Sequence, residues 1–98
     1  MTVTVGLLAL LEAKPDKTGE LAELLKQARQ LALAEDQTVS WYAFQADEVT
    51  YGIFDTFESD EGRQAHLGGE IAKTLMKVAP DLLAKDPDIR PVDVLAVK

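Results

Sequence analysis

The chain contains no cysteine, and it has only one histidine and one tryptophan among its 98 residues. Without cysteine there can be no disulfide, no thiol nucleophile and no thiolate metal ligand. A single histidine is too few for a convincing transition-metal cluster. We therefore expect no metal site and no cofactor. The absence of cysteine also fits a cytoplasmic protein.

Basic residues are scarce, with ten lysines and arginines against seventeen acids, which gives a net charge of −7. Such a chain repels a phosphate backbone, and its scattered basic residues form no stripe, so we expect no nucleic-acid partner. No apolar run approaches the ~20 residues of a membrane span. The apolar segment 1–14 has no basic start, and it predicts a strand, not a signal peptide. We expect no membrane association.

Residues 1–98 predict one domain with an ordinary composition of 47% apolar and 28% charged residues. Alternating and helical apolar patterns, with turn residues between them, divide the chain into elements. Strands are expected over 3–11, 38–46, 49–57 and 89–97, and helices over 15–35, 59–68 and 70–79, with Pro80 breaking or restarting the last one. Asp47-Glu48 is expected to be a two-residue hairpin turn. The order βαββαβ predicts a ferredoxin-like α+β fold, a four-stranded antiparallel sheet with its helices on one face.

Both faces of the predicted sheet are largely apolar. The strand over 38–46 alternates Val39, Trp41 and Ala43 with Ser40, Tyr42 and Phe44. A sheet with one solvated face should instead place a polar residue at every second position. Something must therefore cover the second face, and a second copy of the chain, packed sheet against sheet, predicts a homodimer.

Three stretches carry a resemblance to a known family: PDKTGELAELL at 15–25, the segment 34–44 with VSWYAF, and 54–75 with FDTFES, AHL and KTL. Together they resemble the antibiotic biosynthesis monooxygenase (ABM) domain, a group that includes quinol monooxygenases. The resemblance implies a dimeric α/β barrel with a pocket between the sheet and the helices of each subunit. It also implies oxidation of electron-rich aromatic molecules by dioxygen, often without metal or flavin, although other relatives degrade haem.

His66 is the candidate catalytic residue. A side chain with a pKa near 6.5 could take a proton from a phenol or hydroquinone at neutral pH, and the resulting anion reduces dioxygen more readily. In the alternative interpretation His66 packs at a helix end and hydrogen-bonds to a backbone carbonyl.

One ring pair and three further residues are candidates for binding a small aromatic substrate. A two-residue turn would pair Trp41 with Phe54 on one sheet face, where the rings either hold a flat ligand or fill the core. Asp55, among apolar neighbours, is either a pocket acid or one half of an ion pair. Arg63 either holds an acidic group or pairs with Asp60.

Met76 is the last candidate. In the haem-degrading relatives an Asn, a Trp and a His carry the chemistry, and this chain has Leu8, His66 and Met76 at the corresponding places. We expect no tight haem binding, and Met76 is assigned to substrate binding.

These observations favour a cofactor-independent monooxygenase that oxidises a hydroquinone or polyphenol, with His66 as its base. The alternatives are a non-catalytic small-molecule-binding or structural dimer, and an isomerase or lyase built on the same barrel.

Overall fold

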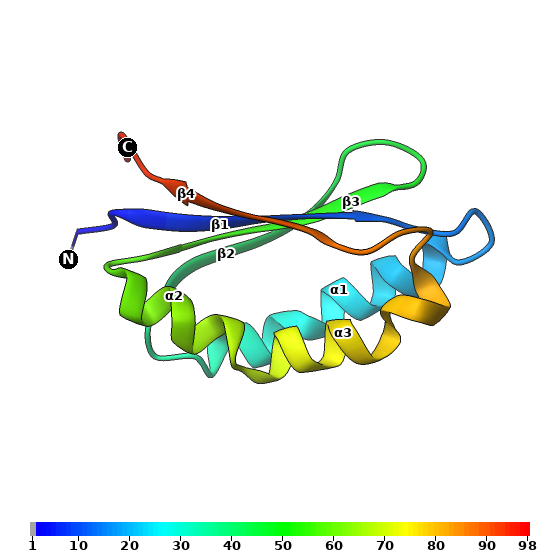
Figure 1. The fold of residues 1–98 in the computed structure, drawn as a ribbon, viewed down its shortest axis with the longest axis horizontal. Helices are drawn as coiled ribbons and strands as arrows, with labels where there is room; N and C mark the ends of the chain where they lie inside the picture. Colours follow the sequence, from blue (N-terminus) through cyan, green and yellow to red (C-terminus); the bar gives the residue numbers. More distant parts are fainter. Residues whose placement is uncertain (1) are drawn as a thin grey trace.

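The computed structural model describes residues 2–98, which form a four-stranded sheet and three helices. The elements, in chain order, are β1 (Val5–Glu12), α1 (Thr18–Leu33), β2 (Thr38–Gln45), β3 (Thr50–Phe57), α2 (Asp60–Leu67), α3 (Glu70–Leu82) and β4 (Asp88–Asp93). The strand order is β2-β3-β1-β4, and every neighbouring pair is antiparallel. All three helices lie on one face of this sheet (Figure 1). The predicted ferredoxin-like α+β fold is confirmed.

The core lies between the sheet and the helices. Its most deeply buried side chains, Leu11 from β1, Leu21 from α1 and Phe57 from β3, are fully enclosed. In α3 the buried residues recur at helical spacing, Ile71, Leu75, Ala79 and Leu82. Because these positions share one side of the helix, α3 packs along the sheet.

The β2–β3 hairpin differs from the two-residue turn that the sequence predicted. The Asp47 carboxylate accepts hydrogen bonds from the backbone amides of Val49 and Thr50, at 3.0 and 2.8 Å. The loop therefore includes Val49 and shifts the register by one residue. A shift of one residue exchanges the two faces of a strand relative to its neighbour.

As a consequence, Trp41 lies opposite Asp55, and Tyr42 lies opposite Phe54. The predicted pairing of Trp41 with Phe54 is wrong. Gly52 lies opposite Phe44, whose ring covers the glycine.

Two other boundaries differ from expectation. The α3 helix continues through Pro80 to Leu82. Proline has no N–H, so the carbonyl of Met76, one turn earlier, loses its hydrogen bond within the helix. Both residues are exposed, so that carbonyl can bind water instead. The β4 strand ends at Asp93, opposite the first residue of β1, Val5. Among the described residues beyond β4, the backbone amide of Val94 still donates a hydrogen bond to the backbone carbonyl of Thr4.

The second face of the sheet carries no helix among residues 2–98 (Figure 1). Tyr42 and Phe44 on this face are 61% and 36% exposed, and Leu8, Leu10 and Phe54 are only partly buried. We call these five residues the outer face. Over the same part of the chain, no helix combines the length and the apolar character needed to cross a membrane.

Candidate functional site

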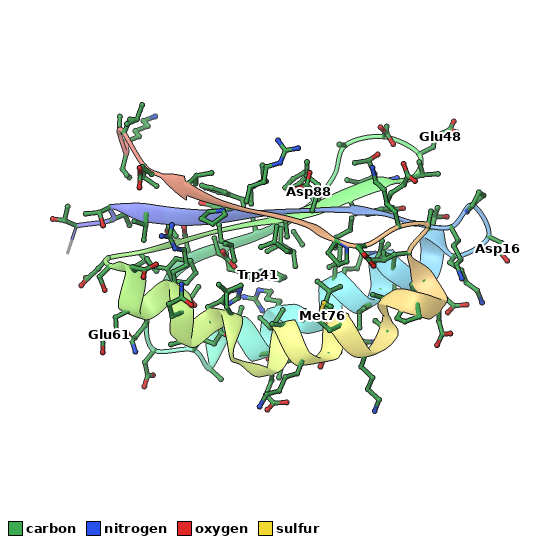
Figure 2. The ribbon with its side chains drawn as sticks, in the orientation of Figure 1. Asp16, Trp41, Glu48, Glu61, Met76 and Asp88 are labelled. Atoms are coloured by element: carbon green, nitrogen blue, oxygen red, sulfur yellow. The ribbon has the colours of Figure 1, made fainter. Side chains whose placement is uncertain are left out.

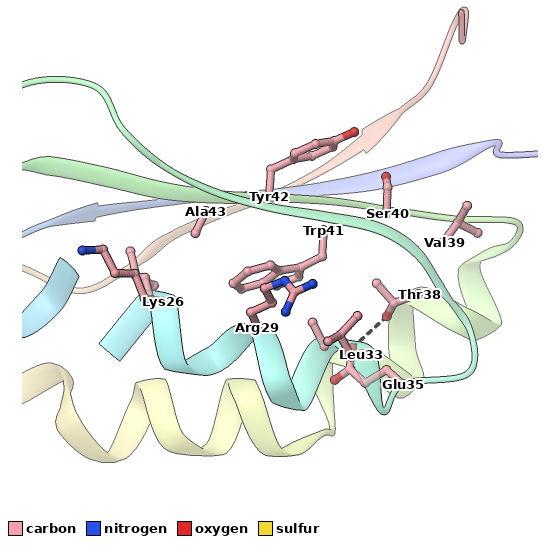
Figure 3. A pocket seen from close by; sticks show the side chains of 12 residues that line it. Lys26, Arg29, Leu33, Glu35, Thr38, Val39, Ser40, Trp41, Tyr42 and Ala43 are labelled. Atoms are coloured by element: carbon pink, nitrogen blue, oxygen red, sulfur yellow. Dashed lines mark hydrogen bonds between the residues drawn. The ribbon is translucent and has the colours of Figure 1, made fainter. Parts of the chain in front are cut away.

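A pocket of about 540 Å³ lies between the second half of α1 and the inner side of β2, and we call it the α1–β2 pocket (Figure 3). Its volume lies within the range of about 300–1,000 Å³ that is usual for small-molecule sites. The helix contributes side chains spaced three to four residues apart, and β2 contributes a continuous run. The lining residues are Leu25, Lys26, Arg29, Ala32, Leu33, Glu35, Thr38, Val39, Ser40, Trp41, Tyr42 and Ala43.

Trp41 forms the wall of this pocket on the sheet side. Its ring extends from β2 into the layer between sheet and helices (Figure 2), and Arg29 on α1 lines the same pocket (Figure 3). The indole Nε1–H is buried and has no hydrogen-bond partner among residues 2–98. Because a buried donor without an acceptor is costly, the site is suited to a ligand that brings an acceptor.

His66, in the last turn of α2, lies between two carboxylates. Nδ1 is 2.7 Å from Oε1 of Glu35, and Nε2 is 2.9 Å from Oδ2 of Asp55. His66 is 6% exposed and Asp55 is 1% exposed. The Asp55 contact is an ion pair without good hydrogen-bond geometry, because neither of its carboxylate oxygens has a hydrogen-bond partner within the described chain. We call Glu35, His66 and Asp55 the buried triad.

The triad holds His66 in its charged form. Burial alone would lower the pKa of His66, but the carboxylates of Asp55 and then Glu35 outweigh burial and raise the pKa to about 9. Burial raises the pKa of the Asp55 carboxyl, while its contact with His66 opposes that rise. At neutral pH His66 is therefore an imidazolium between two carboxylates, which does not fit the expected base with a pKa near 6.5.

The triad borders three cavities. Glu35 lines the α1–β2 pocket, Glu35 and His66 both line a cavity of about 200 Å³ beside α2, and Asp55 and His66 line a cavity of about 40 Å³ between the sheet and the helices α2 and α3. The smallest of these can hold water but not an aromatic ring. An aromatic ligand in the α1–β2 pocket would contact the triad at Glu35, the triad member that lines that pocket. The Glu35 Oε1 atom already accepts hydrogen bonds from His66 and from Thr38 Oγ1, the latter at 2.8 Å (Figure 3).

The structure places the remaining candidates outside the α1–β2 pocket. Phe54 lies on the outer face, opposite Tyr42. Arg63 pairs with Asp60, as one of the two interpretations expected, and also donates to the backbone carbonyls of Gly6 and Val92. Met76 is 62% exposed on α3 (Figure 2). Asp55 has the expected ion pair, but its partner is His66 and not a lysine or arginine.

Sequence reasoning did not single out Glu35, Arg29 or Lys26. A signal for the two basic residues was present, since Lys26, Arg29 and Leu33 recur at helical spacing and share one side of α1. No comparable signal exists for Glu35, because its contact with His66 joins residues 31 positions apart. No group of three or more His, Asp or Glu side chains that could hold a metal ion occurs within residues 2–98.

Solved structures show where this chain belongs. The NE2512 protein of unknown function from Nitrosomonas europaea is 44% identical, over 98% of this chain and 93% of that one, with a TM-score of 0.96. The chain belongs to the family of NE2512. Identity at this level over nearly the whole length shows a common family. Because NE2512 is described as a protein of unknown function, this membership does not indicate an activity.

Two more distant structures share the fold of the NE2512 family. One, from Nitrosomonas europaea, is named "putative antibiotic biosynthesis monooxygenase"; it is 15% identical over 94% of this chain and 90% of that one, with a TM-score of 0.83. Another of that name, from Caulobacter crescentus, is 20% identical over 96% and 92%, with a TM-score of 0.80. They confirm the expected ABM resemblance at the level of fold. No protein-family model and no curated protein matches the chain.

Proposed function

We propose that this chain binds a flat, hydroxylated aromatic molecule in the α1–β2 pocket and oxidises it with dioxygen, without a cofactor. The observation that carries the binding proposal is Trp41, an aromatic wall with an unpartnered buried donor in a pocket of about 540 Å³. The monooxygenase names of the two ABM-fold structures support the reaction class. A hydroquinone or polyphenol is the substrate class that suits this chemistry.

The reaction balances without a further reductant. A hydroquinone that gains one oxygen atom from dioxygen becomes a hydroxyquinone, and the second oxygen atom leaves as water. All four electrons come from the ring, and its ionised form releases them most readily. The protein then needs only to bind, orient and deprotonate the substrate.

Proton transfer is proposed to pass through the buried triad. Glu35 is the triad member that lines the pocket, so it would accept the substrate proton and share it with the neutral form of His66 behind it. The neutral form predominates only above the His66 pKa of about 9. That value lies close to the pKa of a phenol, near 10, and general-base catalysis is efficient when the two are similar. Activity should therefore increase with pH through about 9.

The subunit is proposed to act as a homodimer, with the outer faces of two copies packed together. The exposed Tyr42 and Phe44 and the partly buried Leu8, Leu10 and Phe54 give this face the apolar character that a partner sheet requires.

The test combines binding with turnover. Trp41 is the only tryptophan of the chain, so its fluorescence reports directly on the pocket. Hydroquinones and naphthohydroquinones should quench it and should be consumed with dioxygen, with one ¹⁸O atom from labelled dioxygen in the product. Trp41→Ala removes the fluorophore, so binding to this variant is measured by titration calorimetry and should be weaker than in the wild type. Met76→Ala, outside the pocket, should change neither the quenching nor the turnover.

Variants of the triad test the proton path. His66→Ala and Glu35→Gln should each lower turnover by ~10²–10⁴-fold, the usual contribution of a positioned base. Asp55→Asn removes a carboxylate that raises the His66 pKa, so the rise in activity should move to lower pH. A merely structural role for Asp55 would lower activity without moving the profile. Equal rates in wild type and His66→Ala would exclude the path.

A non-catalytic binding protein is the second candidate. It is favoured by the two carboxylates that hold His66 in its charged form at neutral pH. Quenching of Trp41 without oxygen consumption above the spontaneous background, at any pH up to 10, would support this candidate over the oxygenase.

A further inference from the structure

The α1–β2 pocket contains two hydrogen-bond donors that the protein itself leaves without acceptors. One is the buried Nε1–H of Trp41. The other is the guanidinium of Arg29, a residue exposed to solvent that takes part in none of the hydrogen bonds or ion pairs among residues 2–98. Both side chains line the pocket, Arg29 from α1 and Trp41 from β2 (Figure 3).

The isolation of Arg29 follows from its place in the sequence. The lysines and arginines that form ion pairs each have an acid two or three residues away along the chain. Lys26 pairs with Glu23 in this way, and Arg63 pairs with Asp60. The positions three and four residues from Arg29 are Leu25, Lys26, Ala32 and Leu33, so α1 offers it no anion. Although the chain has a net charge of −7, Arg29 forms no ion pair within the described residues. It lines the same pocket as the only tryptophan.

The charges around the pocket divide it into two ends. Lys26 and Arg29 lie along α1 at one end, and Glu35 lies at the other, where His66 and Thr38 already engage its Oε1. An anionic group is therefore favoured at the arginine end. A guanidinium binds a carboxylate through two parallel hydrogen bonds, and such charge-assisted bonds are stronger and more directional than neutral ones.

We infer that the α1–β2 pocket selects an aromatic carboxylic acid, with its carboxylate on Arg29, its ring against Trp41 and an acceptor oxygen on the indole N–H. The inference rests on the proposed function and narrows its substrate class. A hydroxyl on the far side of the ring would then point toward Glu35. The pocket volume of about 540 Å³ accommodates a ring system of one or two fused rings.

The experiment compares 2-naphthoate with 2-naphthamide, which have the same shape and differ in charge. Binding is followed by Trp41 fluorescence and by the single indole N–H signal in a ¹H–¹⁵N spectrum. Naphthoate should bind at least about tenfold more tightly than naphthamide, the step expected from one charge-assisted contact. Its affinity should fall as salt is added, and the indole signal should shift as Nε1–H gains an acceptor.

Two variants assign the effect. Arg29→Gln should bind naphthoate about as weakly as naphthamide, and its affinity for naphthamide should equal that of the wild type. Arg90→Gln, which removes an exposed arginine on β4, should keep the preference. Equal affinity for the two ligands in the wild type, or an unchanged preference in Arg29→Gln, would overturn the inference while leaving the proposed aromatic site intact. Binding of neither ligand would overturn both.

Discussion

At the scale of single residues, His66 decides how the protein responds to pH. Both of its nitrogens face carboxylates, and its pKa is raised to about 9. A raised pKa means that the folded state binds the proton more tightly than the unfolded chain, whose histidine titrates near 6.5. The stabilisation is complete below about pH 6.5 and is lost as the pH rises through 9.

We expect the free energy of unfolding to fall by roughly 3 kcal/mol between pH 6.5 and pH 10, from a shift of about 2.5 pKa units. Urea unfolding across this range measures the fall. His66 is the only histidine, so its ring signal in an NMR titration gives the pKa without ambiguity. A measured pKa at or below 7 would contradict the account of the buried triad.

The sequence identified three of the site residues, Trp41, Asp55 and His66, but not their surroundings. His66 and Trp41 were recognisable because each is the only residue of its kind and each lies in an apolar pattern. Glu35 was not, because only the folded chain brings residue 35 to residue 66. The expected pKa of His66 failed for the same reason, since it depends on two carboxylates from distant segments.

At the scale of elements, Arg63 attaches α2 to the sheet. Its guanidinium donates to the backbone carbonyls of Gly6 in β1 and Val92 in β4, at 3.1 and 3.2 Å, while it also pairs with Asp60. The side chain is 13% exposed, so these bonds are well shielded from water. They hold in place the helix that carries His66.

Replacing Arg63→Met should lower the free energy of unfolding by about 1.5–3 kcal/mol, because hydrogen bonds of a charged group to two carbonyls are lost. The matched control is Arg90→Met, whose ion pair with Asp88 lies in solvent, so its loss should lower the free energy of unfolding much less than the loss of Arg63 does. Chemical denaturation of the two variants makes the comparison. Equal losses would show that Arg63 is not an anchor of α2.

Two glycines in different elements should respond in opposite ways to alanine. A Cβ at Gly52 in β3 would lie 2.9 Å from the Ala9 carbonyl and inside the space of the Phe44 ring, so Gly52→Ala should destabilise the fold by at least about 1 kcal/mol. A Cβ at Gly19 in α1 meets nothing within 4 Å, so Gly19→Ala should stabilise it by about 0.5–1 kcal/mol. Thermal unfolding measures both, and a shift of the same sign in the two would contradict the packing of Phe44 over Gly52.

Element positions could be predicted from apolar spacing, but the hairpin register could not. Each strand and helix was anticipated to within a few residues. The register depended on how Asp47 binds the amides of Val49 and Thr50, which adds one residue to the loop. That single residue moved Phe54 away from Trp41 and onto the outer face.

At the scale of the whole molecule, the apolar outer face predicts self-association. Tyr42→Arg would place a charge on the exposed outer face, within the proposed contact between two sheets, and we expect it to convert a dimer into a monomer. Met76→Arg, on the exposed side of α3, should leave the dimer intact. Light scattering at micromolar concentration distinguishes the two, and a wild-type monomer under these conditions would contradict the proposed assembly.

The overall topology was predictable because alternating strands and periodic helices in the order βαββαβ allow few arrangements. The predicted second copy of the chain rested on the same alternation, because apolar residues on both faces of a sheet leave one face for a partner. The position of the main pocket was not predictable. It lies where α1 and the edge strand β2 diverge, and the sequence does not encode that gap in any local pattern.

The order of the strands also governs how the chain can fold as it is made. β1 lies in the middle of the sheet, between β3 and β4, yet it is the first strand of the chain and β4 is the last. At about 5–20 residues per second, a ribosome needs roughly 4–15 s to pass from the end of β1 to the start of β4. During that time one side of β1 has no partner. The chain thus completes its sheet only after β4 has been made, and a nascent chain stalled before residue 88 would present the unpaired edge of β1 to chaperones or to other nascent chains.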